Sequence, residues 1–281
     1  MKRPIVDYHI HTEYSFDWST LLPGRVFDIC DGALKNGVTQ IAITDHLDVN
    51  TVYSGELIML DTKQVREDVM RAKKAYEGRL DIIYGIELGQ PHQVPQFASE
   101  ILKNNKYEYV IGSYHNNIDV CDFSLIDYQN TPHETLIRYY ENYLDETADH
   151  IKWCVGRIST LGHLGYPIRY FMRNNLTELV NPYDEKYMKR MKYIFELLIK
   201  HEIALEVNTS GWRQGMNNSM ALDGMVQCYV DMGGKLITIG SDSHGAHFIG
   251  SDIEREYDIL KKLGVREITT FVNGVRGSFE L

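Results

Sequence analysis

Two histidines separated by one residue close the first strand-like segment of the chain. His9 and His11 lie at the end of residues 6–11, which have the pattern of a β-strand. Side chains two positions apart on a strand point to the same face, so both imidazoles can bind one metal ion. Asp17 follows the polar, turn-forming residues 12–16, so its carboxylate can fold back over the strand end. The residue types and spacing therefore predict a metal site near the start of the chain.

The same arrangement recurs, because five further strand-like segments end in side chains that can bind a metal. These residues are Asp45 and His46 after 41–44, Glu87 after 80–86, His115 after 107–114, His163 after 159–162, and Asp242 with His244 after 236–241. One such residue arises easily by chance, whereas candidate ligands at one end of six strands favour a shared site. Imidazole and carboxylate ligands without thiolate suit zinc, iron or manganese.

Amphipathic helices are expected between these strands. The predicted helices cover residues 26–36, 62–76, 93–105, 133–154, 185–201, 219–232 and 253–263, and two further strands cover 204–207 and 268–272. The longest helix carries tyrosines and leucines at intervals of three and four residues, a pattern typical of a buried stripe. Regular alternation of strand and helix predicts an α/β barrel, in which catalytic groups gather at the carboxyl ends of the strands. We expect residues 1–281 to form one such domain.

Composition indicates which partners, which state of the cysteines and which cellular location to expect for this protein. The 281 residues carry a formal net charge of −10, which disfavours nucleic acid because the phosphate backbone requires a basic surface. The four cysteines (Cys30, Cys121, Cys154 and Cys228) form no C-x-x-C pair, so we expect reduced, mostly buried thiols. A charged-then-apolar leader and a long apolar span are both absent from the sequence, so we expect a cytoplasmic protein without a membrane partner.

Six short motifs, in order along the chain, resemble those of the polymerase and histidinol phosphatase (PHP) superfamily. They are His9-Ile10-His11-Thr12 with Ser15 and Asp17, Thr44-Asp45-His46, Gly85-Ile86-Glu87, Gly112-Ser113-Tyr114-His115, Gly162-His163 and Gly240-Ser241-Asp242-Ser243-His244. Three more look most like the monofunctional L-histidinol-phosphate phosphatases within it: Asp7-Tyr8-His9, Gly165-Tyr166-Pro167 and Leu205-Glu206-Val207-Asn208-Thr209-Ser210-Gly211. The resemblance implies a distorted (β/α)7 TIM-like barrel.

The resemblance also implies up to three divalent or trivalent metal ions held by nine ligands. Its ligand groups are His9, His11, Glu87 and Asp242 on the first ion, Glu87 as a bridge with His115 and His163 on the second, and Asp17, His46 and His244 on the third. Two ions about 3.5–4 Å apart can lower the pKa of a water molecule for in-line attack on phosphorus. A third would neutralise phosphate oxygens and the leaving alkoxide.

The activity implied by the resemblance is hydrolysis of L-histidinol phosphate to L-histidinol and phosphate in histidine biosynthesis. Glu87, Asp242 and His244 are the expected catalytic residues. The proton for the departing alkoxide is expected from a group close to it, which is Asp242, His244 or a water molecule on a metal. One alternative is a PHP phosphoesterase acting on nucleotides or other small phosphate monoesters. A second is a metal-binding accessory module, because PHP domains also occur attached to polymerases.

Four residues are expected to contact the substrate. Arg169 and Arg213 follow strand ends and are predicted to lie on loops at the metal face, where either binds phosphate or is an ordinary surface arginine. Asp48 and Glu13 flank metal motifs, so an acid at either position is expected to pair with the amine or imidazole of histidinol.

Three other polar residues and two long loops are candidates to shape the site. Asp45 either orients an imidazole or bonds the backbone of its own turn. Glu206 and Asn208 alternate on one strand, so they are expected on one face, either lining the pocket or satisfying barrel hydrogen bonds. The loops 47–61 and 116–132 are long enough to form pocket walls.

Overall fold

Seven parallel strands form the barrel at the centre of the computed structural model, which describes residues 3–19, 21–49 and 59–281. Their order is β1-β2-β4-β5-β6-β7-β8, and the short strand β3 pairs with β4. The strands are β1 (Val6–Ile10), β2 (Gln40–Ile43), β3 (His46–Asp48), β4 (Asp81–Gly89), β5 (Tyr109–Ser113), β6 (Thr160–Leu161), β7 (Ala204–Asn208) and β8 (Ile237–Gly240). The expected (β/α)7 barrel is confirmed.

The barrel closes between its first and last strands. Beyond the end of β8, Ser243 forms a parallel bridge with Ile10, and the His11 N–H donates to the Ser243 carbonyl at 2.9 Å. At this seam Gly240 lies against His9, and a Cβ on residue 240 would stand 2.3 Å from the His9 Cβ. Glycine therefore allows the last strand to approach the first histidine of the chain.

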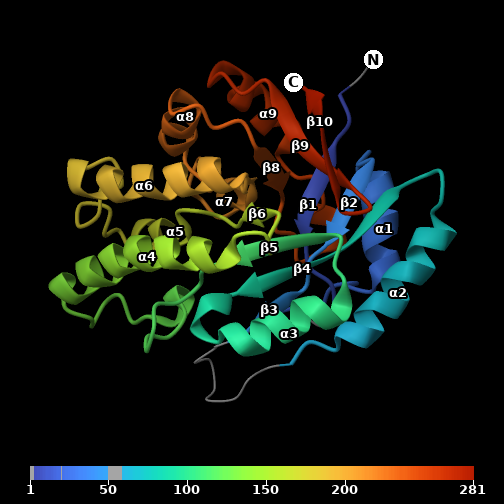
Figure 1. Ribbon diagram of the computed structural model, residues 1–281, viewed down its shortest axis with the longest axis horizontal. Helices are drawn as coiled ribbons and strands as arrows, with labels where there is room; N and C mark the ends of the chain where they lie inside the picture. The colour runs from blue at the N-terminus through green and yellow to red at the C-terminus, as the bar shows by residue number, and fades with distance from the viewer. Residues whose placement is uncertain (1–2, 20, 50–58) are drawn as a thin grey trace.

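Helices surround the strands, as Figure 1 shows. They are α1 (Val26–Lys35), α2 (Thr62–Ala75), α3 (Pro95–Asn105), α4 (His133–Cys154), α5 (Tyr166–Arg173), α6 (Glu185–His201), α7 (Ser210–Arg213), α8 (Asp223–Asp231) and α9 (Ile253–Lys262), with short 3-10 turns η1 (Pro91–Gln93), η2 (Phe123–Leu125) and η3 (Ala246–Phe248). All seven predicted helices are present, although α8 starts later than expected. The sequence analysis missed α5 and α7, each of which directly follows a strand end.

The tyrosine stripe of α4 is core, as its spacing predicts. Tyr140 and Tyr143 are fully buried, and the Tyr140 ring packs edge-on against Tyr187 of α6 with centroids 4.9 Å apart. An ion pair between Lys186 and Glu141, 2.9 Å apart, ties the two helices together at the surface. The long helices α4 and α6 run parallel to each other, since Glu141 faces Lys186 and Asp145 faces Arg190, and together they cover one side of the barrel (Figure 1).

The predicted strand 268–272 exists, but it lies outside the barrel sheet. It forms β9 (Glu267–Val272), which pairs antiparallel with β10 (Val275–Glu280). The backbone of Phe271 accepts from the Gln40 side chain at 3.1 Å and donates to the Tyr8 hydroxyl at 3.2 Å. Because Gln40 is the first residue of β2, the hairpin covers the amino ends of the strands and leaves the carboxyl ends open.

Two expectations from composition can be compared with the described part of the chain. None of its helices is long and apolar enough to cross a membrane. All four cysteines are free; Cys30 and Cys154 are buried, whereas Cys121 and Cys228 are partly exposed.

His150 on α4 should make folding stability depend on pH. Its ring is fully buried with Nδ1 unpaired, and burial, assisted by repulsion from His92, lowers its pKa from 6.5 to about 3. The unfolded chain therefore binds a proton that the folded chain excludes, so stability present above pH 6.5 is lost as the pH falls toward 3.

Thermal unfolding of wild type and His150→Leu between pH 7.5 and 5 measures this contribution. The variant should lose less of its melting temperature on acidification than wild type, whereas His133→Gln, at an exposed position on the same helix, should follow wild type. Parallel curves for wild type and His150→Leu would contradict the assignment.

Candidate metal centre

The carboxylate of Glu87 lies at the centre of a ring of imidazoles. Its Oε2 is 3.0 Å from His9 Nε2 and 2.8 Å from His46 Nδ1. Its Oε1 is 3.2 Å from His115 Nε2 and 2.8 Å from His163 Nε2. The strand β4 continues past Glu87 to Gly89, so this carboxylate points into the barrel mouth from within a strand. Glu87 therefore faces two sets of potential ligands, one on each oxygen.

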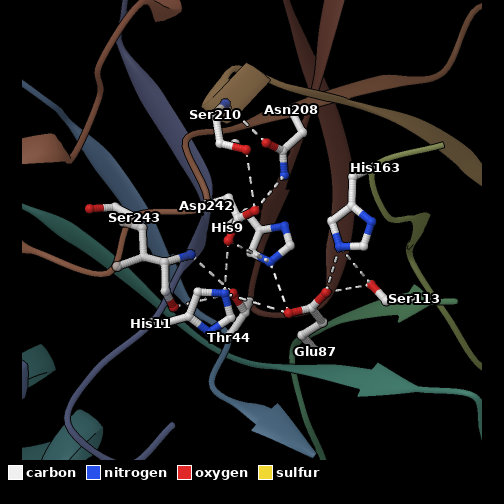
Figure 2. Close-up of polar contacts among 12 residues, drawn as sticks. His9, His11, Thr44, Glu87, Ser113, His163, Asn208, Ser210, Asp242 and Ser243 are labelled. Atoms are coloured by element: carbon white, nitrogen blue, oxygen red, sulfur yellow. Dashed lines mark hydrogen bonds and ion pairs between the residues drawn. The ribbon is translucent and has the colours of Figure 1, made fainter. Parts of the chain in front are cut away.

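Asp242 lies on the other side of the first two histidines. Its Oδ1 is 3.2 Å from His11 Nε2 and 3.9 Å from His9 Nε2. Figure 2 shows His9, His11 and Asp242 converging with Glu87 and His163 from different strands. Asp242 adopts a left-handed conformation with φ of 51°, which turns the chain at the end of β8 and directs the carboxylate inward.

A third group lies nearer to solvent. His244 Nε2 is 2.9 Å from Asp17 Oδ2, and His46 Nε2 is 3.6 Å from the same oxygen. The His11 ring stacks on both histidines, with centroids 4.1 Å from His244 and 4.2 Å from His46. The structure thus brings together all nine residues expected as ligands, and ligand atoms of His11, His46 and His244 lie within 4.8 Å of one another.

Hydrogen bonds to Nδ1 leave Nε2 of His9 and His115 to face the metal site. His9 Nδ1 is 2.7 Å from Glu206 Oε1, and His115 Nδ1 is 3.0 Å from Asp48 Oδ2. Because a carboxylate can only accept, each imidazole donates from Nδ1. The backbone N–H of His163 donates to the second oxygen of Glu206, Oε2, at 2.6 Å. Glu206 therefore holds two of the predicted ligands in place.

Asp45 acts on His11 through Ser15. It accepts from the Thr12 N–H at 2.6 Å and from the Ser15 hydroxyl at 2.8 Å. Ser15 Oγ lies 3.1 Å from His11 Nδ1, and because the serine hydroxyl is already donated, His11 must donate from Nδ1. Asp45 therefore holds the turn after β1. It thus orients an imidazole, one of the two roles expected from the sequence, but does so through Ser15 instead of by a direct bond.

Small polar side chains complete the support. The Ser113 hydroxyl donates to Glu87 Oε1 at 2.6 Å. The Ser210 hydroxyl and the Asn208 amide approach Asp242 Oδ2 at 3.3 and 3.4 Å. The sequence analysis did not single out Ser113 or Ser210 as supporting residues, although both lie in quoted motifs.

Charges in the cluster favour ionised carboxylates beside a neutral imidazole. Burial alone would raise the pKa of Glu87, but His46, His9 and His115 hold it well below its usual range. Burial would likewise raise the pKa of Asp242, and the surrounding histidines hold it well below normal. Burial, with repulsion from His244 and His46, lowers the pKa of His11 to about 3. The neighbouring carboxylates in turn raise the pKa of His9, His46 and His115 against the effect of burial, so metal binding would release protons from these imidazoles.

Several buried atoms at the centre face one another at ion-pair distance but make no hydrogen bond with the described residues. They are His9 Nε2, His11 Nε2, His46 Nδ1, Glu87 Oε2 and His244 Nε2. Buried polar atoms are normally paired, because leaving one unpaired costs free energy. Unpaired lone pairs that converge from imidazoles and carboxylates are the donor set of a metal site. The side chains present therefore fit bound metal ions.

A cavity of about 570 Å³ opens over the cluster. Arg169 and Arg213 both line it, but the prediction that they lie on loops is wrong, because Arg169 belongs to α5 and Arg213 ends α7. Arg213 Nη2 donates to the carbonyl of Ser241 at 2.8 Å, while its Nη1 is buried and unpaired. Helices, not mobile loop ends, therefore hold both guanidinium groups.

The two acids expected near the substrate differ in position. Asp48 lines the cavity, although one of its oxygens is taken up by His115. Glu13 is exposed and is not among the described residues that line the cavity. The loop 116–132 contributes Asp122 and Ser124 to the wall, and the sequence analysis identified neither. Residues 50–58 of the other expected wall, 47–61, lie outside the described residues.

Comparisons with known proteins agree on one family. Residues 7–210 match the PHP domain model; the match ends before Asp242 and His244, which the fold brings to the same cluster. The chain is 26% identical over 274 residues to a histidinol-phosphatase of Lactococcus lactis, covering 95% of this chain and 94% of that protein. It is 29% identical over 265 residues to a probable histidinol-phosphatase of Thermotoga maritima, covering 92% of each.

Two solved structures share the fold. The crystal structure of histidinol phosphate phosphatase from Lactococcus lactis, complexed with zinc, L-histidinol and phosphate, superposes with a TM-score of 0.73 at 21% identity, covering 97% of this chain and 98% of that one. A putative histidinol phosphatase from Listeria monocytogenes gives a TM-score of 0.70 at 17% identity, covering 89% and 99%.

Replacing the central carboxylate should remove metal without unfolding the barrel. Glu87→Gln keeps the shape of the side chain but loses its charge, so we expect at least one equivalent of metal fewer per chain than wild type after dialysis. Elemental analysis measures the metal, and circular dichroism checks the fold. Glu196→Gln, at an exposed position on α6, is the matched control. Equal metal content in Glu87→Gln and wild type would rule out a central ligand role.

Proposed function

This chain belongs to the PHP domain family, and from that premise we propose that it is a metal-dependent phosphomonoesterase that hydrolyses L-histidinol phosphate to L-histidinol and phosphate. The observation that carries the proposal is a cluster of imidazoles and carboxylates beneath a cavity lined by three arginines of the described chain, Arg169, Arg173 and Arg213. Relatives named histidinol-phosphatase match over more than nine-tenths of this chain. The Lactococcus lactis protein holds zinc, L-histidinol and phosphate in the same fold.

The nine clustered residues would hold up to three metal ions, zinc, iron or manganese. Glu87 would bridge two of them, since its two oxygens face different histidines. Asp17, His46 and His244 would hold the third, with the stacked His11 ring close by. When bound, such ions lower the pKa of water and neutralise charge on phosphate oxygens.

Other side chains would bind the phosphate of the substrate and orient the metal-binding histidines. Arg169 and Arg213 present planar, permanently charged donor groups, which match the oxygens of a phosphate better than lysine does. The unpaired Nη1 of Arg213 is a donor available to an anion in the cavity. Glu206 and Asp48 fix the rings of His9 and His115 before substrate arrives, so little reorganisation is needed during reaction.

We also propose that residues 1–281 act as a single catalytic domain. The first and last predicted ligands, His9 and His244, come from opposite ends of the barrel sequence and meet only where β1 and β8 close the sheet. Removing either end would therefore remove ligands along with a closing strand.

A substrate panel tests the activity. We expect kcat/KM for L-histidinol phosphate to exceed that for nucleoside monophosphates, sugar phosphates and p-nitrophenyl phosphate by a hundredfold or more, about 2.7 kcal/mol of transition-state binding. Broad or nucleotide-centred activity would replace the substrate but retain a PHP phosphoesterase. Metal-loaded protein that releases no phosphate from any ester would contradict the enzyme assignment and favour an accessory module.

Arg169 should contribute to phosphate binding. Arg169→Ala removes a charged double donor, so we expect KM to rise about tenfold to a hundredfold. The inhibition constant for inorganic phosphate should rise in parallel. Arg190→Ala, which removes an outer α6 arginine paired with Asp145, serves as the control. Unchanged KM and phosphate inhibition in a folded Arg169→Ala protein would take this arginine out of the site.

A further inference from the structure

One wall of the cavity carries a continuous chain of hydrogen bonds from an arginine to a carboxylate. Arg169 Nη2 donates to the Tyr170 hydroxyl, which donates to the Tyr166 hydroxyl at 3.0 Å. Tyr166 in turn donates to Asp122 Oδ1 at 3.0 Å. All four residues line the cavity. The spacing of four between the tyrosines places both hydroxyls on one face of α5, so the wall is positive at one end and negative at the other.

Asp122, at the negative end, is a buried carboxylate without a cationic partner. Only 3% of its surface is exposed. Its hydrogen bonds, from Tyr166 and from the Ser124 N–H at 2.6 Å, both end on Oδ1. Among the described residues, no lysine or arginine forms an ion pair with it within 4.0 Å. A buried, unpaired carboxylate is costly, and an incoming cation would offset that cost.

The surroundings of Asp122 favour an organic cation over another metal ion. Asp48 and His115 lie close by, with ligand atoms within 4.8 Å of Asp122. The His115 ring, however, uses Nδ1 toward Asp48 and Nε2 toward Glu87. It has no further nitrogen for an ion at Asp122. The second oxygen of Asp122 therefore suits an ammonium group, which needs a charged acceptor but no imidazole ligand.

We propose that Asp122 binds the ammonium group of the substrate while Arg169 binds its phosphate. The enzyme would then select phosphate monoesters that carry an amine at a set distance from phosphorus. This inference rests on the proposed phosphomonoesterase function and adds to it the residue that recognises the charged part of L-histidinol phosphate. Occupation of both ends by a zwitterionic ester neutralises the arginine and the carboxylate that the tyrosines connect.

The substitution Asp122→Asn tests the assignment, because it preserves the shape of the side chain. The amide oxygen can still accept from Ser124 and Tyr166, whereas the charge is lost and an NH2 donor replaces the second oxygen. Asp127→Asn is the matched control, because Asp127 accepts from the N–H two residues later, as Asp122 does, but is exposed. Each protein is assayed with L-histidinol phosphate, its analogue lacking the amine, its analogue lacking the imidazole, and p-nitrophenyl phosphate.

We expect Asp122→Asn to lower kcat/KM about tenfold to a hundredfold for the two esters that carry the amine, mainly through KM. The other two esters should change less than twofold, and Asp127→Asn should match wild type on all four. An equal loss on every ester would assign Asp122 to the metal centre. A loss that follows the imidazole instead of the amine, or no loss at all, would also overturn the inference.

Binding of the product separates this inference from the proposed function. Calorimetric titration with L-histidinol requires no turnover, and Asp122→Asn should bind it about tenfold or more weakly than wild type, with inorganic phosphate bound equally well. Wild type that releases no phosphate from any ester would contradict the phosphatase assignment alone. Equal affinity of wild type and Asp122→Asn for L-histidinol would contradict the role of Asp122, whatever the enzyme hydrolyses.

Discussion

Burial of the Glu87 carboxylate is the constraint on which the rest of the structure depends. A fully buried negative charge is tolerated only when it is compensated, and here four imidazoles approach its two oxygens. These histidines come from separate strand ends, so the compensation requires the barrel to be closed and in register. The fold and the site are therefore coupled: parallel strands bring the ligands together, and the cluster in turn draws the strand ends toward one point.

The hydrogen bonds behind the histidines decide how the cluster can be used. Glu206, Asp48 and the Asp45–Ser15 pair each accept or relay a bond from an Nδ1 atom. In the neutral form of each ring, this bond keeps the proton on Nδ1 and leaves the lone pair of Nε2 facing the centre. The carboxylates thus serve two purposes: some face the metal site directly, and others hold the histidines in place through hydrogen bonds. Their sequence spacing does not distinguish the two.

Two short helices, which begin shortly after strand ends, form part of the wall of the cavity above the cluster. α5 starts three residues after His163, and α7 starts two residues after Asn208. A helix held directly on a strand end is a rigid support, so the arginines it carries have defined positions relative to the metal ligands. The same helix α5 places two tyrosines between its arginine and the acid of the neighbouring loop. Charge is thereby distributed along the wall, positive near one end and negative near the other.

The sequence by itself determined the seven barrel strands and β9, the seven longer helices and the set of candidate ligands, but not β3 or β10. These features are local. Hydrophobic periodicity defines the elements, and the spacing of His9 and His11 on one strand indicates that both can bind the same metal ion. Only the tertiary structure decided what the other polar residues do. Arg169 was misplaced on a loop because an eight-residue helix is too short to show a reliable period. Asp122 was missed because its role comes from hydrogen bonds to a distant helix, and such long-range partners leave no local pattern.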